Sequence, residues 1–236
     1  MANYEWVVLD ADGTLFDYDR AETEALSAAF ASFDACPDAS ALAVYREVND
    51  RLWKAFERGE VTQERLRTQR FADLFAAIGL TLDPDRFSQT YLTHLARGTY
   101  LINDAEHVVR SLRSEVRLVL LTNGLADVQR PRLARSALRG LFDAVVISEE
   151  VGVAKPDGRV FDICFRHMGR PAKSSVLMVG DSLSSDIRGG IDYGIDTCWV
   201  NLDTHPPDPV RQPRFVIRQL TELLPIVLGD TSSDVG

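Results

Sequence analysis

The sequence contains little cysteine and little histidine. Its three cysteines, Cys36, Cys164 and Cys198, are odd in number and far apart, and no pair has the spacing of a metal site. We therefore expect free thiols that are buried in a reducing compartment. The four histidines are equally scattered, and their spacing indicates neither a metal site nor a catalytic triad.

Long apolar runs and an excess of basic residues are also missing. No segment approaches the roughly 20 apolar residues that span a bilayer, and residues 1–6 contain no basic region followed by an apolar run. We therefore expect no signal peptide, no membrane partner and a cytoplasmic location. The net charge of −9 argues against a nucleic-acid polymer as partner. It is compatible with a small anionic substrate, because metal ions and local cations can override the global charge.

Residues 17–97 carry the pattern of a helical bundle. Apolar residues recur at helical spacing, and no strand-like alternation interrupts them. Thr62 is placed to cap one of these helices, and Gly79 is placed to end it. The predicted helices cover residues 21–33, 41–58, 62–78 and 85–96.

The rest of the chain alternates strands and helices, which is typical of an α/β fold with a parallel sheet. The predicted strands cover residues 6–9, 116–121, 144–147, 175–179, 196–200 and 215–217. The predicted helices cover residues 104–113, 125–138, 156–168 and 184–193, and a last one reaches residue 224. Ligands of open parallel sheets bind outside the carboxyl ends of the strands. The polar residues expected at these ends are Asp10, Asp12, Thr122, Asn123 and Asp181, with Lys155 in a nearby loop.

The strand over residues 6–9 ends in Asp10-Ala11-Asp12-Gly13-Thr14, a pattern suited to phosphoryl transfer. A carboxylate such as Asp10 can attack phosphorus and form a covalent aspartyl-phosphate. A second acid at Asp12 can protonate the leaving alkoxide and then deprotonate the water that cleaves the intermediate. Gly13 allows a sharp turn and offers amides to phosphate oxygens. The alternative for this pentapeptide is an Asx turn with solvated carboxylates.

Three further motifs follow that first one in order along the chain. They are Thr122-Asn123-Gly124, Lys155 before Pro156, and Gly180-Asp181 followed by residues 182–186. As an ordered set, the four motifs resemble those of the haloacid dehalogenase-like (HAD) hydrolase superfamily, in its subfamily I with a helical cap. The resemblance implies a Rossmann-like parallel sheet core formed by residues 1–16 and 98–236. It also implies an all-helical cap domain formed by residues 17–97.

The resemblance implies a catalytic role for several motif residues. Asp10 resembles the nucleophile, Asp12 the general acid and base, and Lys155 the lysine that pairs with the phosphate and the nucleophile. Thr122 resembles the hydroxyl that binds the phosphoryl group. The implied phosphate-binding residues are Thr122, Asn123, Gly124 and Lys155.

Mg²⁺ is the cofactor that the resemblance implies. Its ligands would be the carboxylates of Asp10 and Asp181 and the carbonyl oxygen of Asp12, while Asp186 would hold the water shell or orient its neighbours. Four converging carboxylates would repel one another without a counterion, and a hard cation with oxygen ligands resolves this conflict. Two alternatives stay open: Lys155 as a solvated loop lysine, and Asp186 as a partner of a helix dipole.

The superfamily that the motifs resemble includes several chemistries. Its dehalogenases lack an acid two residues after the nucleophile and its phosphonate-cleaving members carry a small residue there, so Asp12 argues against both. Residues 146–156, 176–191 and 194–201 resemble the branch of pyrimidine 5′-nucleotidases. We therefore predict a Mg²⁺-dependent phosphomonoester hydrolase that acts through an aspartyl-phosphate on pyrimidine nucleoside 5′-monophosphates. Its oligomeric state would be a monomer or a homodimer. The alternatives are a sugar-phosphate phosphatase or phosphomutase, and a non-catalytic nucleotide-binding regulator.

Several residues outside the motifs are candidates for contact with the leaving group. They are Phe16, Trp53, Lys54, Arg58 and Arg70. They offer an aromatic surface and cations for a base or a ribose, and a cap over the site would also exclude water. The more ordinary interpretation places Trp53 in the core of the helical bundle and Lys54 and Arg58 on its solvated face.

Overall fold

The computed structural model of the chain describes residues 2–206 and 212–229 and divides into two compact units. One, the α/β unit, comprises Met1–Tyr18, Tyr100–Ala126 and Leu133–Gly236. The other, the helical unit, comprises Asp19–Thr99 and Asp127–Arg132. Residues 127–132 thus group with the helical unit although they follow a strand of the α/β unit.

The α/β unit is built on a six-stranded parallel sheet, as the sequence predicts. The strand order is β3-β2-β1-β4-β5-β6. The strands are β1 (Trp6–Leu9), β2 (Arg117–Thr122), β3 (Ala144–Ile147), β4 (Val176–Gly180), β5 (Asp196–Val200) and β6 (Phe215–Ile217). The order reverses between β1 and β4, and such a switch point opens a crevice outside the carboxyl ends of the strands.

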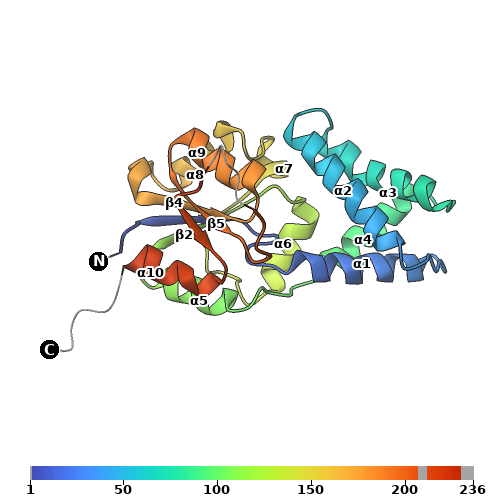
Figure 1. Cartoon of the computed structure of the whole chain (residues 1–236), viewed down its shortest axis with the longest axis horizontal. Coiled ribbons are helices and arrows are strands. Elements are labelled where there is room, and N and C mark those ends of the chain that lie inside the picture. The colour runs from blue at the N-terminus through green and yellow to red at the C-terminus, as the bar shows by residue number, and fades with distance from the viewer. Residues whose placement is uncertain (1, 207–211, 230–236) are drawn as a thin grey trace. The chain divides into compact units, whose positions relative to one another are not determined.

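Helices cover both faces of this sheet (Figure 1). Val7 and Leu9 of β1 pack in one cluster with α5 (Ala105–Arg113) and α10 (Leu223–Leu228). Trp6 and Val8 point to the other face and pack in a second cluster with α8 (Gly158–His167). This alternation is the two-residue period of a strand that is buried on both faces.

The helices of the α/β unit differ from the predicted ones at several ends. Predicted helix 156–168 begins at Gly158, because the Asp157 side chain accepts a hydrogen bond from the Arg159 N–H and caps the first turn. Predicted helix 184–193 is a π-helical turn over Leu183–Ile187 followed by α9 (Arg188–Tyr193). The remaining elements are α6 (Ala126–Arg135), the unpredicted α7 (Ser148–Val151), and 3₁₀ turns over Lys173–Ser175 and Leu220–Glu222.

Besides the part of α6 that groups with it, the helical unit contains the four helices that the sequence predicts. They are α1 (Tyr18–Ser32), α2 (Ala41–Glu57), α3 (Gln63–Ile78) and α4 (Pro84–Leu95). The Thr62 side chain accepts a hydrogen bond from the Arg65 N–H at the start of α3, and Gly79 ends the helix with φ of 68°. Both predicted signals of this helix are confirmed. The buried Phe71 ring lies 5.1 Å, between ring centres, from Phe87 and from Tyr91, so aromatic side chains fill the core.

The cysteines and the surface complete this description. Cys164 and Cys198 are buried, and burial raises the pKa of each thiol to about 12. Cys36 is exposed in the segment that joins α1 to α2, so the prediction of a buried thiol is wrong there.

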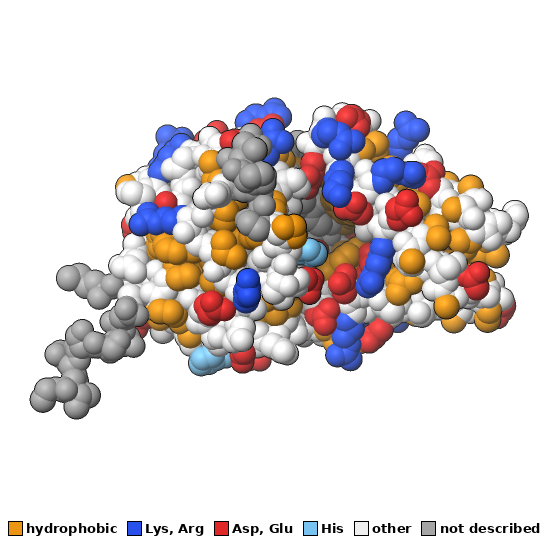
Figure 2. All heavy atoms as spheres, viewed as in Figure 1, with side chains coloured by type: hydrophobic (Ala, Val, Ile, Leu, Met, Phe, Trp, Pro, Cys, Tyr) orange, Lys and Arg blue, Asp and Glu red, His pale blue; other side chains and the backbone are white. Residues whose placement is uncertain are grey.

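Figure 2 shows acidic and basic side chains intermingled on the visible face of the helical unit. In the part of the chain that the structure describes, no helix is long and apolar enough to cross a membrane.

Candidate active site

Lys155 is the centre of a group of charged side chains at the carboxyl ends of the strands. Its Nζ lies 2.5 Å from Asp10 Oδ1 and 2.7 Å from Asp186 Oδ1, and it donates to the Leu121 carbonyl oxygen at 2.8 Å. Asp10 follows β1, Leu121 belongs to β2, and Asp186 lies in the π-helical turn after β4. Lys155 is only 1% exposed, so it is not a solvated loop lysine.

Three carboxylates converge beside this lysine. Asp10, Asp181 and Asp186 each offer an oxygen, and these oxygens all lie within 4.8 Å of one another. Thr14 donates a hydrogen bond to Asp181 Oδ1 at 3.0 Å, and the Ser182 N–H donates to Asp186 Oδ2 at 3.0 Å. The group therefore has fixed acceptor positions rather than freely rotating side chains.

Two glycines leave the room that these carboxylates occupy. A Cβ on Gly13 would overlap the Asp181 carboxylate, and a Cβ on Gly180 would overlap that of Asp186. Gly13 also has φ of 78°, a conformation that other residues rarely adopt. The glycines of the first and fourth sequence motifs thus allow the close approach of the acidic residues.

The charge of this group is unbalanced. Burial, together with the Asp186 and Asp181 charges, raises the pKa of Asp10 although Lys155 opposes the shift. Burial and the charge of Asp186 raise the pKa of Asp181 to about 7. Burial opposes the charged form of Lys155, but Asp10 and Asp186 outweigh it and raise the pKa of the lysine. When all four groups are ionised, three carboxylates and one ammonium leave an excess of two negative charges, and a divalent cation with oxygen ligands fits that excess and the donor set.

The loop after β2 holds Lys155 in place through Asn123. Asn123 Nδ2 donates to the Lys155 carbonyl oxygen, and Asn123 Oδ1 accepts from the Lys155 N–H, each at 2.9 Å. The sequence indicated only the backbone amides of Asn123 and Gly124, and it gave no signal for this side-chain role across 32 residues. Thr122 is buried, and its hydroxyl oxygen accepts a hydrogen bond from the Gly124 N–H at 3.0 Å.

Asp12 and Phe16 lie on the turn that follows Asp10. The Asp12 side chain is partly exposed, and its carboxylate is not one of the three that converge. Phe16 is 1% exposed, packs in the core cluster that contains α5, and pairs its backbone with Leu101. Its side chain therefore stabilises the turn from inside the α/β unit.

The candidate specificity residues of the helical unit make local contacts. The Trp53 ring packs edge-on against Phe56, and Lys54 pairs with Asp50 at 2.7 Å on the surface. Arg58 likewise forms an exposed ion pair with Glu60. These contacts agree with the ordinary structural interpretation of the three residues.

Arg70 has a different environment in the same unit. It is 1% exposed and donates to Asn49 Oδ1 at 3.3 Å. Its guanidinium lies 5.0 Å from the ring centre of Phe71 and 5.2 Å from that of Tyr91. The contact set is that of a buried cation in an aromatic core.

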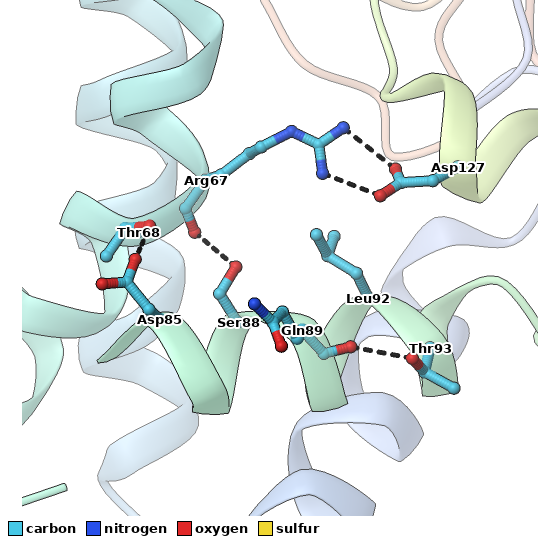
Figure 3. Close-up of a pocket in the computed structure, with 8 residues that line it drawn as sticks. All are labelled: Arg67, Thr68, Asp85, Ser88, Gln89, Leu92, Thr93 and Asp127. Carbon is cyan, nitrogen blue, oxygen red and sulfur yellow. Dashed lines mark hydrogen bonds and ion pairs between the residues drawn. The ribbon is translucent and has the colours of Figure 1, made fainter. Parts of the chain in front are cut away.

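A polar pocket of about 380 Å³ lies within the helical unit (Figure 3). Arg67 points into it, and its guanidinium donates two hydrogen bonds to the Asp127 carboxylate, at 2.8 and 3.1 Å. The pocket is lined by Arg67, Thr68, Asp85, Ser88, Gln89, Leu92, Thr93 and Asp127. Its lining contains no member of the carboxylate group, so the converging residues of the α/β unit are the stronger candidate for a catalytic site.

Comparisons with known proteins relate this chain to a family of hydrolases. A family model described as haloacid dehalogenase-like hydrolase matches residues 4–194. The pyrimidine 5′-nucleotidase YjjG of Escherichia coli is 34% identical over 93% of this chain and 96% of its own. The pyrimidine 5′-nucleotidase PynA of Streptococcus pneumoniae is 32% identical over 94% of each chain. A crystal structure of the HAD hydrolase YfnB of Bacillus subtilis bound to magnesium is 33% identical, with a TM-score of 0.90 over 95% of this chain and 98% of that one.

Proposed function

The chain belongs to the haloacid dehalogenase-like hydrolase family, and we propose that it is a Mg²⁺-dependent phosphatase for pyrimidine nucleoside 5′-monophosphates. The observation that carries this proposal is the contact between Asp10 and Lys155 beside two further carboxylates. A nucleophilic carboxylate, a cation and an acidic cation-binding group are the components that phosphoryl transfer to aspartate needs.

Asp10 acts as the nucleophile in this proposal. Its carboxylate oxygen bonds to phosphorus while the ester P–O bond breaks, and Asp12 gives its proton to the leaving alkoxide. A water then attacks the aspartyl-phosphate and passes a proton to Asp12, which releases inorganic phosphate and restores Asp10. Lys155, held against Asp10 Oδ1, neutralises negative charge on the phosphoryl group. Thr122, Asn123 and Gly124 supply the hydroxyl and amides for its oxygens.

Mg²⁺, when bound, supplies positive charge that lets an anionic carboxylate approach a phosphate dianion. Asp10 and Asp181 would hold it with their carboxylates and Asp12 with its carbonyl oxygen. Asp186 pairs with Lys155 and would orient both lysine and metal shell. The fixed positions of these acceptors and their charge excess support the assignment, and the YfnB structure contains magnesium.

The choice of substrate rests on the relatives. Two proteins named pyrimidine 5′-nucleotidase are 34% and 32% identical over nearly the whole chain. We propose that the helical unit reads the base and ribose as a cap domain, with the partly exposed Trp53 and the exposed Lys54 and Arg58 as the residues to test.

A phosphate-release assay over a panel of phosphomonoesters tests this function. UMP, dUMP and dTMP should give the highest kcat/KM, ahead of purine nucleotides and sugar phosphates, and EDTA should abolish the activity. Asp10→Asn should lower kcat by at least about a thousandfold because the nucleophile is lost. Asp162→Asn is the matched control, since Asp162 is an exposed carboxylate of α8 that accepts from the Tyr193 hydroxyl.

The same assay separates the alternatives. Preference for sugar phosphates would replace the nucleotide proposal by a sugar-phosphate phosphatase, and transfer of the phosphoryl group to a second hydroxyl would indicate a phosphomutase. Full activity of Asp10→Asn would remove the covalent mechanism. Tight nucleotide binding without turnover in Mg²⁺ would indicate a regulator.

A further inference from the structure

Trp199 lies in the strand next to the one that leads to Asp181. It belongs to β5, where its register partner in β4 is Gly180. Its neighbours Cys198 and Val200 pack in the cluster that contains α5 and α10. The Trp199 side chain therefore points to the opposite face of the sheet, and it is 3% exposed there.

The indole of Trp199 binds the backbone of the acidic loop. Trp199 Nε1 donates a hydrogen bond of 2.8 Å to the main-chain carbonyl oxygen of Asp181. An indole N–H can only donate, and when it is buried it normally finds an acceptor. Asp181 is thus held at two points, by Trp199 at its carbonyl group and by Thr14 at its carboxylate.

These two contacts fix different degrees of freedom. The Thr14 hydroxyl sets the rotation of the carboxylate, whereas the indole sets the main chain of the residue directly after β4. We propose that Trp199 is a positioning residue that holds the Asp181 backbone so that its carboxylate meets those of Asp10 and Asp186. The inference rests on the proposed function, which makes Asp181 a Mg²⁺ ligand. Groups behind metal ligands commonly tune metal affinity by orienting the ligand.

The variant Trp199→Phe tests this role because it keeps an aromatic ring and removes the donor. The midpoint of Mg²⁺-dependent thermal stabilisation should move to about three- to tenfold higher Mg²⁺ concentration, the effect of losing one hydrogen bond. At saturating Mg²⁺, kcat should return close to the wild-type value, since Trp199 does not touch the reacting atoms. A purely structural role would lower the melting temperature without moving the Mg²⁺ midpoint.

Trp6→Phe is the matched control. Trp6 is also 3% exposed in the sheet, but its ring packs in the cluster with α8 and lies over the Arg117 guanidinium. This variant should lose stability and keep the wild-type Mg²⁺ midpoint. An unchanged midpoint in Trp199→Phe, beside a wild type that binds Mg²⁺, overturns the role of Trp199 and leaves the proposed function intact. A wild type that Mg²⁺ does not stabilise overturns both.

A second measurement covers a Trp199→Phe variant that fails to fold. The chain has three tryptophans, so the double variant Trp6→Phe/Trp53→Phe leaves Trp199 as the fluorophore. Its emission should change saturably with Mg²⁺, at the midpoint of the thermal stabilisation. Emission that stays constant while Mg²⁺ stabilises the protein contradicts the proposal.

Discussion

The sequence motif predicts a role for the backbone amide of Asn123, and the structure adds a role for its side chain. Its side chain makes two hydrogen bonds of 2.9 Å to the main chain of Lys155, whose ammonium group contacts Asp10. The lysine side chain is long and flexible, so its tip is placed accurately only if its backbone is fixed. Asn123 therefore connects the loop after β2 to Lys155, whose ammonium group is the positive charge beside Asp10.

Asn123→Ala should lower both stability and turnover. Removal of the amide leaves the Lys155 N–H and carbonyl oxygen without these partners, which costs about 1–3 kcal/mol. Displacement of the ammonium by about an ångström should lower kcat by about a hundredfold. Steady-state kinetics and urea unfolding measure the two effects separately.

Asn201 provides the control for this variant. It makes the same pair of hydrogen bonds to the main chain of His205, at 2.8 and 2.9 Å, on another segment of the α/β unit. Asn201→Ala should reduce stability and leave kcat unchanged. Equal kcat values for Asn123→Ala and the wild type would show that the Lys155 backbone needs no such support.

The sequence indicated the charged residues of the candidate site, but it did not indicate the residues whose hydrogen bonds position them. Asp10 and Asp181 directly follow strands, Lys155 lies in a loop between them in the chain, and the parallel sheet brings strand ends together. Asp186 was expected near the metal, and the structure adds its contact with Lys155. The supports from Asn123 and Trp199 join segments that are 32 and 18 residues apart, and no local pattern predicts such pairs.

At the scale of elements, the sequence likewise predicted features set by neighbouring residues and missed one that it could not resolve. Helix α3 was predicted from Thr62 to Gly79 because both signals act within one turn of the chain. The π-helical turn over Leu183–Ile187 was missed because a helical pattern of residues does not distinguish a π turn from an α turn, and its Asp186 contacts the distant Lys155. Local signals in the sequence predict local structure, and tertiary contacts decide the rest.

The caps of the helical unit give a prediction at this scale. Thr62 accepts from the Arg65 N–H, and Asp83 accepts from the N–H groups of Asp85 and Arg86. Thr62→Ala and Asp83→Ala should each lower the free energy of unfolding by about 1 kcal/mol. Urea unfolding followed by circular dichroism measures this loss.

Ser40 serves as the control for these caps. It precedes α2 but makes no capping hydrogen bond with its side chain. Ser40→Ala should therefore change stability by no more than about 0.5 kcal/mol. A loss equal to that of Thr62→Ala would mean that the hydrogen bonds at α3 and α4 are not the source of the effect.

At the scale of the whole molecule, the site concentrates part of the negative charge of an acidic chain. The net charge is −9, and the three converging carboxylates exceed the one lysine beside them by two negative charges. The protein folds in spite of this repulsion because the sheet and its two helical layers bury enough apolar surface. Like charges that are buried together repel one another and lower the free energy of unfolding, and the apolar core must offset this loss.

This charge excess should couple Mg²⁺ binding to pH. The pKa of Asp181 is raised to about 7 from a usual value of 3.8, so the folded state without metal favours the protonated acid. Its contribution to stability is therefore full below about pH 4 and is lost as the pH rises through about 7. The melting temperature in EDTA should fall over this range on account of Asp181.

Mg²⁺ should reverse the trend, because a bound divalent cation requires the ionised carboxylate and releases its proton. The increase in melting temperature that Mg²⁺ produces should thus be larger at about pH 7.5 than at about pH 5.5. Thermal unfolding with EDTA or Mg²⁺ at both pH values measures the difference, and Asp181→Asn should abolish the Mg²⁺ increment at each. An increment that is independent of pH in the wild type would place the cation away from Asp181, since binding there must displace a proton.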